Sequence, residues 1–577
     1  MGVLTWNWRQ AALLVLMVAA SLVVGRRLID LQVIQHDALA QKAHDQYVQF
    51  RTLQPTRGMI YDADNEPLVT NQLLYKVAAF PQKIADDDAK ARGAVTNIAT
   101  ILGKDDLTLW GLIQNAQRQK WPYVRLAENI SDDVATQLSN LHIPWLDLVP
   151  HDRPAYPNGQ LASQTLGFML SNPNDLNVGY GQYGLQQYYD QQLRGITKTV
   201  PAGDPLVRPS GASLYLTVRS AVQLEVEQTL ADTVRSSRAD GGVAIVMDPH
   251  TGAILAMAGN PTYDPNLYYK VKNKDYSVYQ NPAVSWTYEP GSTFKVLTIA
   301  AGLDSGKITP QTTVEDWGHA QCGGWALHNW DNGNGWGVET PTIMLRHSAN
   351  IGALKFAQMM GKNVFYRYVA NFGLNQPTGV DVTGEVGGHI VFPDDPHGWW
   401  PCNLLTNSYG QGLQVTPLQL ITAVAAVAND GWMMRPYVVR QIQQPSSGGL
   451  RTTTVAPHRV RQVISAQTAH VLTDILEESA KDGEAQKALV DGYGVAAKTG
   501  TASVAGNSGC GYNCGLGTIA SIIGFAPAHH PRFVMLIVIK HPQTQQWGSV
   551  IAAPAFNTIA QRLLLMMGVR PNSPEAR

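Results

Sequence analysis

The sequence predicts a mixed α/β (α+β) protein whose second half is an antiparallel sheet packed by helices. Two pairs of apolar strand runs carry this prediction, 241–247 with 254–258 and 519–526 with 533–539. Helical runs lie between the two pairs, so the sheet must be assembled from pieces that are far apart in the chain. An elongated module of mixed structure and one N-terminal apolar helix precede this half.

Composition and charge suit a folded protein and give no sign of a nucleic-acid partner. Apolar residues make up 45% of the 577 residues, as in ordinary globular chains. The net charge is −1 and no run of like charge stands out, so no nucleic acid is expected as a partner. The length corresponds to roughly four domain-sized units, of which one large α/β domain can account for two.

A transmembrane anchor and juxtamembrane helix is predicted at 11–34, after a short tail at 1–10. The uncharged run Ala11–Gly25, extended toward the N-terminus, reaches about 20 residues, enough to cross ~30 Å of hydrocarbon. A cleavable signal peptide is the alternative, but the apolar pattern continues past Arg26 and Arg27, which favours one uncleaved helix. The arginines flanking the segment on both sides do not fix its orientation.

Residues 35–215 are predicted to form a non-catalytic module. An alternating run that begins at Arg57 predicts an edge strand and a hairpin, and a loop rich in Asn and Gly is expected at 171–182. Helices are predicted at 86–102, 131–141 and 183–193. No candidate nucleophile with a neighbouring base occurs here, so the module is expected to act as a spacer or in recognition.

Residues 216–568 are predicted to form one catalytic domain, followed by a tail at 569–577. A strand at 213–217 and a long helix at 219–237 lead into the first strand pair, which turns at Asp248–Gly252. A helix at 555–567 is expected to end the domain, with no accessory domain after it.

Three short motifs in this half together predict a serine acyl-transfer site that does not use histidine. They are Ser292-Thr-Phe-Lys295, Ser348-Ala-Asn350 and Lys498-Thr-Gly-Thr501, in that order. Taken singly, each motif is better explained as a helix-cap serine, a surface serine or a solvated lysine. The ordered set, with Pro and Gly directly before the first motif, favours catalysis.

The residue types fit an acyl transfer in which lysine is the base. Ser292 is predicted in the first turn of a helix, where unsatisfied N–H groups favour developing negative charge. Lys295 follows on the same face and can take the serine proton if burial or a second cation, Lys498, depresses its pKa. Ser348 is expected to relay a proton to the leaving amine, and Asn350 to hold the substrate amide or the lysine.

The remaining motif residues are expected to bind the substrate. Gly500 allows a substrate backbone to approach as an added strand. The backbone N–H groups of Ser292 and Thr501 would form an oxyanion hole around the attacked carbonyl. The hydroxyls of Thr499 and Thr501 are available to a substrate carboxylate.

The cysteines and one polar cluster leave alternatives open. Four cysteines permit two disulfides or four free thiols, and a small loop could be closed between the last two of them: Cys322, Cys402, Cys510 and Cys514. A weak metal site is the alternative use of Asp316, His319, Cys322 and His328. Their spacing matches no strong zinc pattern, so no metal and no other cofactor is expected.

Further motifs accompany the catalytic set over nearly the whole chain. They are Arg57-Gly-x-Ile60 with Asp62, Asp248-Pro-x-Thr-Gly252, Gly410-Gln-Gly412 before Val415-Thr-Pro417, and Gly524-Phe-Ala-Pro527. With them the chain resembles the class B, monofunctional penicillin-binding proteins, whose transpeptidase domain has the serine β-lactamase-like fold. The hairpin after Asp62 departs from the family pattern, because it lacks the usual glycine.

The resemblance implies a peptidoglycan D,D-transpeptidase. Ser292 would attack the penultimate D-Ala of a stem peptide, the terminal D-Ala would leave, and an amine of a neighbouring stem would resolve the acyl-enzyme. It also implies covalent inhibition by β-lactams at Ser292, and a cytoplasmic amino terminus with the catalytic domain outside the cell membrane. Because nothing before residue 215 resembles a glycan-polymerising domain, a membrane polymerase of the shape, elongation, division and sporulation type is the implied partner.

Other functions of the same motifs are possible at this stage. Water would resolve the acyl-enzyme in a D,D-carboxypeptidase or a serine β-lactamase, and a β-lactam sensor or a scaffold would not turn over at all. The analogy slightly favours cell division over elongation. The segment 323–330, with Trp336, either lines the substrate groove or is a packed glycine-rich loop.

Overall fold

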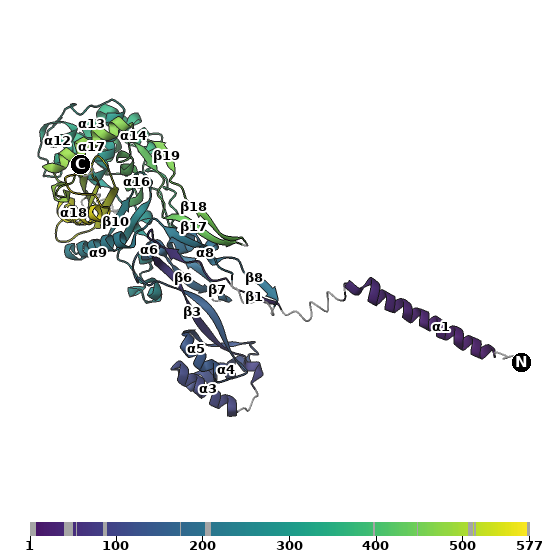
Figure 1. Ribbon diagram of the computed structural model, residues 1–577. Helices are drawn as coiled ribbons and strands as arrows, with labels where there is room; N and C mark the ends of the chain where they lie inside the picture. The colour runs from purple at the N-terminus through teal and green to yellow at the C-terminus, as the bar shows by residue number, and fades with distance from the viewer. Residues whose placement is uncertain are drawn as a thin grey trace. The chain divides into compact units, whose positions relative to one another are not determined.

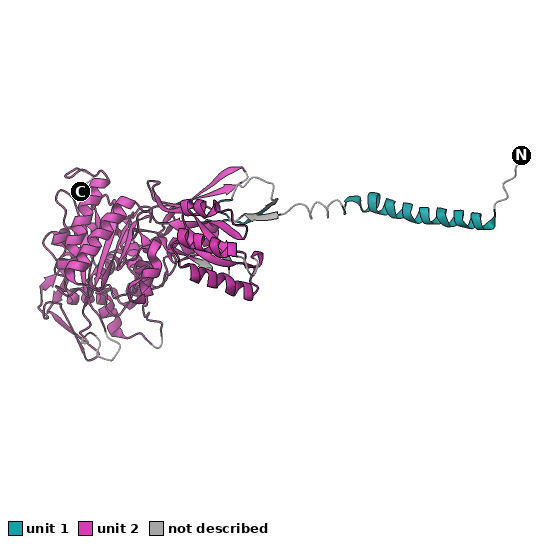
Figure 2. Ribbon diagram, turned by 90° about the horizontal axis from the view of Figure 1, so that it is seen from below, with its two compact units in different colours: residues 1–56, 195–210 teal, residues 57–194, 211–577 magenta. Residues whose placement is uncertain are grey.

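The computed structural model describes residues 7–37, 39, 50–53, 55–84, 89–172, 175–201, 209–395, 398–446, 448–505, 512 and 515–573 (Figure 1). The chain divides into two compact units, 1–56 with 195–210 and 57–194 with 211–577 (Figure 2). The predicted domain limits, 35–215 and 216–568, are not tested by this division and stay a prediction.

The first unit contains an apolar helix and a short strand pair. Helix α1 (Trp8–Ile29) continues into a π-helical turn (Asp30–Ile34), and together they form 27 residues with a mean hydropathy of 2.1 and no buried residue in the apolar window. Strands β1 (Phe50–Leu53) and β8 (Lys198–Pro201) pair in antiparallel fashion. The helix is long and apolar enough to be a candidate membrane span, in agreement with the predicted anchor.

The second unit is built around a five-stranded antiparallel sheet in the order β11-β10-β22-β21-β20. Its strands are β10 (Gly241–Met247), β11 (Ile254–Asn260), β20 (Ala496–Ser503), β21 (Thr518–Ala526) and β22 (Phe533–Lys540). The sheet joins segments almost 300 residues apart, as the apolar runs predicted, and β20 lies at its edge.

Helices cover both faces of this sheet. On β10, Ala244 and Val246 pack in one core with α9 (Ser220–Ser237) and α18 (Gly548–Met566), which lie together in Figure 1. The alternating Val243 and Ile245 pack in the larger core on the other face, with α11 (Lys295–Asp304) and α16 (Pro417–Val427). This alternation of side chains across a strand places the sheet between two helical layers.

The helices of the larger core surround α11. They are α10 (Pro282–Ser285), α12 (Pro341–His347), α13 (Asn350–Met360), α14 (Lys362–Asn371), α15 (Pro401–Asn407) and α17 (Ala466–Lys481). Small antiparallel pairs lie between them: β12 (Val314–Asp316) with β15 (Gly337–Glu339), β13 (His319–Cys322) with β14 (Trp325–His328), and β16 (Trp432–Met434) with β19 (Arg459–Gln462).

A second sheet combines strands from the N-terminal module with strands from the second half. Its order is β18-β17-β9-β2-β3-β4, with β5 also paired to β3. The strands are β2 (Ile60–Tyr61), β3 (Pro67–Ala79), β4 (Val124–Ile130), β5 (Leu146–Ala155), β9 (Ser213–Leu216), β17 (Val439–Ser446) and β18 (Gly449–Thr454). Helices α3 (Ala89–Leu102), α4 (Asp106–Arg118) and α5 (Asp132–Ser139) share one core with the far end of β3.

Several local predictions differ from the structure. The predicted edge strand β2 is interior, because β9, 154 residues further along the chain (Ile60 pairs with Leu214), pairs with it in parallel. The loop expected at 171–182 belongs to a hairpin of β6 (Phe168–Asn172) and β7 (Asp175–Gln182). Gly181 does not mark a loop there; a Cβ atom on it would lie 1.7 Å from the Gln186 carbonyl oxygen, so it permits a close contact instead.

Two helices also differ from their predicted bounds. The helix expected at 183–193 is two short helices, α7 (Gly184–Tyr188) and α8 (Asp190–Arg194), after the short α6 (Ser163–Leu166). Helix α18 begins at Gly548 instead of 555 and accommodates Pro554 in its second turn. Packing of its apolar face on the sheet outweighs the local cost of the proline.

The hairpin that lacks the family's glycine keeps a tight turn. Asn65 takes the left-handed conformation with φ +67°, which asparagine tolerates better than most residues. The Asp62 carboxylate accepts hydrogen bonds from the backbone N–H groups of Asp64 and Glu66, at 2.9 and 2.8 Å. These contacts stabilise the turn without glycine.

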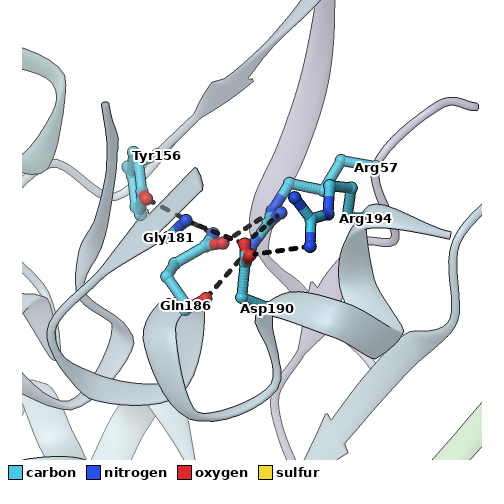
Figure 3. Close-up of polar contacts among 6 residues, drawn as sticks. All are labelled: Arg57, Tyr156, Gly181, Gln186, Asp190 and Arg194. Atoms are coloured by element: carbon cyan, nitrogen blue, oxygen red, sulfur yellow. Dashed lines mark hydrogen bonds and ion pairs between the residues drawn. The ribbon is translucent and has the colours of Figure 1, made fainter. Parts of the chain in front are cut away.

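The buried guanidinium of Arg57 ties the start of this sheet to α7 and α8 (Figure 3). Its Nε and Nη2 donate to the side chain and the carbonyl of Gln186, at 2.8 and 3.0 Å, and Nη1 donates to Asp190 at 2.9 Å. The same carboxylate accepts from the N–H of Gly181 at 2.8 Å. Arg57 is only 6% exposed, so its charge depends on Asp190.

We therefore expect Asp190→Ala to lower the free energy of unfolding of the module by about 3 kcal/mol, because it leaves a buried cation unpaired. Urea unfolding of the full-length protein in detergent, followed by protease cleavage within 57–194, measures this loss. Asp232→Ala removes the exposed ion pair with Arg235 and is the matched control, with an expected change of no more than about 0.5 kcal/mol. Equal losses in the two variants would contradict this account of Arg57.

Candidate active site

Two glycines bring the first motif against neighbouring segments. Ser292 lies in a 3-10 turn (Gly291–Phe294) that leads directly into α11, and its side chain is partly exposed. Gly291 has φ +57°, and a Cβ on it would lie 3.1 Å from that of Ala502 on β20. Its N–H donates to the Gly410 carbonyl at 3.0 Å, and a Cβ on Gly410 would lie 2.2 Å from the Gly291 oxygen. Both positions therefore require glycine.

Lys295, the first residue of α11, is fully buried and directed at the second motif. Its Nζ donates to the Ser348 carbonyl at 2.5 Å and to Asn350 Oδ1 at 2.9 Å, with the Ser348 hydroxyl at 3.5 Å. Three oxygens thus surround an amine that has three protons when charged.

The break between two helices presents the second motif. Ser348 ends α12 in the left-handed conformation with φ +55°, and Asn350 begins α13. The Asn350 side chain also donates to the His328 carbonyl at 3.0 Å, and its backbone N–H donates to Asn329 Oδ1 at 2.8 Å. A left-handed serine is uncommon, and here this conformation accompanies a hydroxyl that lies between two lysines.

The third motif lies on the edge strand β20. Lys498 is buried, and its Nζ donates to the Ser348 hydroxyl at 2.9 Å and to the Thr499 carbonyl at 3.0 Å. Thr501 Oγ1 accepts from the N–H of Gly548 at 3.1 Å, which leaves its O–H free to donate. A Cβ on Gly500 would lie 2.5 Å from the hydroxyl of Ser521 and 3.1 Å from the Pro290 carbonyl oxygen, so glycine lets this strand approach the nucleophile turn.

Burial and mutual repulsion set the charges of the two lysines. Burial lowers the pKa of Lys295 well below its ordinary value, and the charge of Lys498 lowers it further. Burial also lowers the pKa of Lys498, to about 8. A free-base Lys295 beside a protonated Lys498 is therefore the favoured arrangement near neutral pH.

Two buried carboxyl groups near Lys295 were not predicted from the sequence. Asp316 and Glu339 lie on the paired strands β12 and β15 and are both fully buried. Burial, and then the neighbouring Asp316, raise the pKa of Glu339 to about 8, so Glu339 is a neutral acid at pH 7. Gly352 leaves room for it, because a Cβ there would lie 2.2 Å from Glu339 Oε2.

Some of the predicted site residues come together and others do not. The three motifs converge through Ser348, as their chemistry requires. The weak metal cluster does not assemble: Cys322 is bonded to Cys402, and Asp316 accepts from Gly318 N and Asn329 Nδ2 at 2.6 and 2.7 Å. No group of three His, Cys, Asp or Glu side chains suited to a metal occurs among the described residues.

Cys322 and Cys402 form a disulfide, so the alternative of four free thiols is wrong. Cys510 and Cys514 lie outside the described residues. Glu289, beside the nucleophile turn, was not predicted as a site residue. Its carboxylate accepts from the Tyr512 hydroxyl at 2.8 and 3.0 Å and from Gly412 N at 3.1 Å.

Comparison with known families matches both halves of the chain. Residues 242–561 match the penicillin-binding protein transpeptidase domain, and residues 52–200 match the penicillin-binding protein dimerisation domain. The transpeptidase match alone covers more than half of the chain. The protein belongs to the penicillin-binding proteins, and the dimerisation domain in front of the transpeptidase domain makes it a member of class B.

Individual relatives agree with this assignment. The chain is 31% identical to stage V sporulation protein D of Bacillus subtilis over 572 residues, which cover 95% of this chain and 84% of the relative. It is 27% identical to the peptidoglycan D,D-transpeptidase FtsI of Escherichia coli, over 98% of this chain and 93% of the relative. A crystal structure of penicillin-binding protein 3 of Mycobacterium tuberculosis with aztreonam is similar at a TM-score of 0.69 and 26% identity, over 91% of this chain and 99% of that one.

The charge arrangement of the lysines predicts a pH profile for acylation by a labelled penicillin. The rate should fall above pH about 8, where Lys498 loses the proton that it holds toward Ser348. Lys498→Met should lower the rate by about 10²-fold or more and move the acid limb to higher pH, because removing the neighbouring charge raises the pKa of Lys295. Rapid-quench labelling of the full-length protein from pH 5 to 10 measures both effects.

Lys487→Met, which removes an exposed lysine, is the control and should leave the profile unchanged. An acid limb that stays in place in Lys498→Met would contradict the proposed coupling of the two lysines.

Proposed function

We propose that this protein is a membrane-tethered peptidoglycan D,D-transpeptidase that crosslinks stem peptides through an acyl-enzyme on Ser292. The proposal depends on Lys295, which lies three residues after the nucleophile Ser292. Its buried amine hydrogen-bonds Ser348 and Asn350. A hydroxyl needs a base to attack a carbonyl, and a lysine with a lowered pKa supplies one.

In the first step, Ser292 Oγ transfers its proton to Lys295 Nζ and attacks the carbonyl carbon of the penultimate D-Ala. The N–H groups of Ser292 and Thr501 stabilise the oxyanion. The tetrahedral intermediate collapses, the bond to the terminal D-Ala breaks, and the Ser348 hydroxyl passes a proton to the leaving amine. Lys295 and Lys498 both hydrogen-bond that hydroxyl, so a proton can return to it from either amine.

The substrate peptide is expected to bind as an added strand along β20. This strand ends the sheet, so its outer edge can pair with another extended backbone. We expect the hydroxyl groups of Thr499 and Thr501 to bind the terminal carboxylate; Thr501 Oγ1 accepts a hydrogen bond from Gly548 N, so its O–H can donate.

In the second step, an amine of a neighbouring stem attacks the acyl-enzyme. It gives a proton to Lys295, the new peptide bond forms, and Ser292 recovers its proton. A β-lactam carries a strained amide that Ser292 opens in the same way, and it leaves a covalent adduct.

Helix α1 is proposed as a single membrane span with the amino terminus in the cytoplasm and the catalytic domain outside. Its apolar window has no buried residue, whereas the other apolar helix of sufficient length, α18, is 44% buried in the catalytic core. The proposed partner is a glycan polymerase of the shape, elongation, division and sporulation type, contacted through the anchor and the region next to it. A division role is slightly favoured over elongation.

Labelling with a fluorescent penicillin, followed by peptide mapping, tests the nucleophile. The label is expected on Ser292 and should be absent in Ser292→Ala, because the proposed mechanism makes Ser292 the nucleophile and gives the Ser348 hydroxyl only a proton relay. Label on another residue of the wild-type protein would refute the assignment of Ser292.

Turnover separates the transpeptidase from the hydrolytic alternatives. We expect the purified full-length protein to form crosslinks in uncrosslinked peptidoglycan, with a penicilloyl adduct that persists for many turnover times. Rapid release of the adduct by water, without crosslinks, would identify a carboxypeptidase or β-lactamase instead. Crosslinking by purified Ser292→Ala would refute Ser292 as the nucleophile, whereas normal crosslinking in cells that express only Ser292→Ala would indicate a scaffold whose partner performs the chemistry.

A further inference from the structure

Two segments joined by a disulfide, 317–336 and 399–402, carry three tryptophans that are more than half exposed. Trp325 is 75% exposed, Trp400 70% and Trp317 65%. Six of the chain's 14 tryptophans lie in these two segments: 317, 325, 330, 336, 399 and 400. Single exposed apolar residues are ordinary, but a concentration of exposed indoles marks a binding surface. We call Trp317, Trp325 and Trp400 the tryptophan platform.

A disulfide joins the two backbone segments that carry Trp325 and Trp400. Trp325 is the cross-strand partner of Cys322 in the β13–β14 hairpin, and Cys322 is bonded to Cys402, two residues after Trp400. The Cα atoms of the two cysteines are 5.7 Å apart, so the disulfide holds both segments together. Trp317 lies two residues before the same hairpin. Backbone segments held together before binding lose less conformational entropy when a ligand arrives.

The hairpin that carries the platform also contacts the second catalytic motif. The carbonyl of His328 accepts from Asn350 Nδ2 at 3.0 Å. The indole N–H of Trp330 donates at 2.9 Å to the carbonyl of His347, the residue before Ser348. The segment that carries Trp317 and Trp325 is therefore hydrogen-bonded to the second catalytic motif at its far end.

The hairpin segment itself carries no Asp, Glu, Lys or Arg. This holds for residues 317–330. The hairpin therefore offers aromatic faces and neutral hydrogen-bonding groups, which suit an uncharged ligand.

We propose that the tryptophan platform binds the glycan part of the substrate polymer, a neutral chain of N-acetylated sugars, while the attached peptide occupies the candidate active site. This inference rests on the proposed function and adds a second binding site to it. The stem peptides carry carboxylates and amines, so the glycan is the uncharged part of this substrate. The C–H bonds on one face of a pyranose ring pack against the electron-rich face of an indole, and its acetamido groups hydrogen-bond neutral donors and acceptors.

The test compares a substrate that has a glycan with one that has none. In the double variant Trp325→Gln, Trp400→Gln, we expect KM for uncrosslinked peptidoglycan to rise about tenfold, with kcat and the rate of acylation by a labelled penicillin changed by less than about twofold. Quenching of tryptophan fluorescence by a hexamer of N-acetylglucosamine should also weaken. Trp121→Gln, which removes a 47% exposed tryptophan from the N-terminal module, is the matched control and should change none of these quantities.

Three results would overturn the proposal. One is an unchanged KM for the polymer together with unchanged quenching. A second is an equal loss of polymer crosslinking and of penicillin acylation, which would assign these tryptophans to the shape of the active site. The third is a loss of binding to phospholipid vesicles without a change in KM, which would assign them to a membrane surface.

The two proposals fail in different ways. If wild-type Ser292 takes no penicillin label, the proposed function fails. The quenching by the sugar hexamer in the wild type and in the double variant then still decides whether the platform binds glycan.

Discussion

The burial of the Lys295 amine is the constraint on which the rest of the site depends. An ammonium group without solvent is costly, and among the residues that the structure describes no carboxylate hydrogen-bonds it; its partners there are two oxygens of Ser348 and one of Asn350. Those three acceptors stabilise the charged amine when it takes a proton, and burial with Lys498 favours the neutral amine before that. A general base must exist as the neutral amine before the reaction and as the protonated amine after it, and the surroundings of Lys295 stabilise both forms.

The three catalytic motifs meet because each lies at the end of a helix or at the edge of the sheet. The nucleophile turn precedes α11, the second motif lies between α12 and α13, and the third lies on the edge strand β20. The position of each motif depends on one backbone feature: the left-handed conformation of Ser348, or the close packing that glycine allows at 291 and 500. Such positions cost stability locally, and the two large cores on either side of the sheet compensate.

The parts that could be predicted from the sequence are those with a local signal. Buried apolar runs predicted four of the five strands of the central sheet, all but β20, and the three motifs predicted the chemistry because residue types and order are visible in the chain. The interior place of β2, the bond of Cys322 to Cys402 and the Asp316–Glu339 pair depend on contacts between distant segments. The hairpin at 168–182 was missed because glycines that permit close packing look like glycines of a loop.

Chemical rescue tests the central claim, that Lys295 is the base for Ser292, most directly. In Lys295→Ala, acylation by a labelled penicillin should fall by about 10²-fold or more and should recover when small primary amines are added. The recovered rate should follow the concentration of the unprotonated amine as the pH is varied. A Lys295→Ala protein that acylates at the wild-type rate, with the wild-type pH profile, would contradict the account.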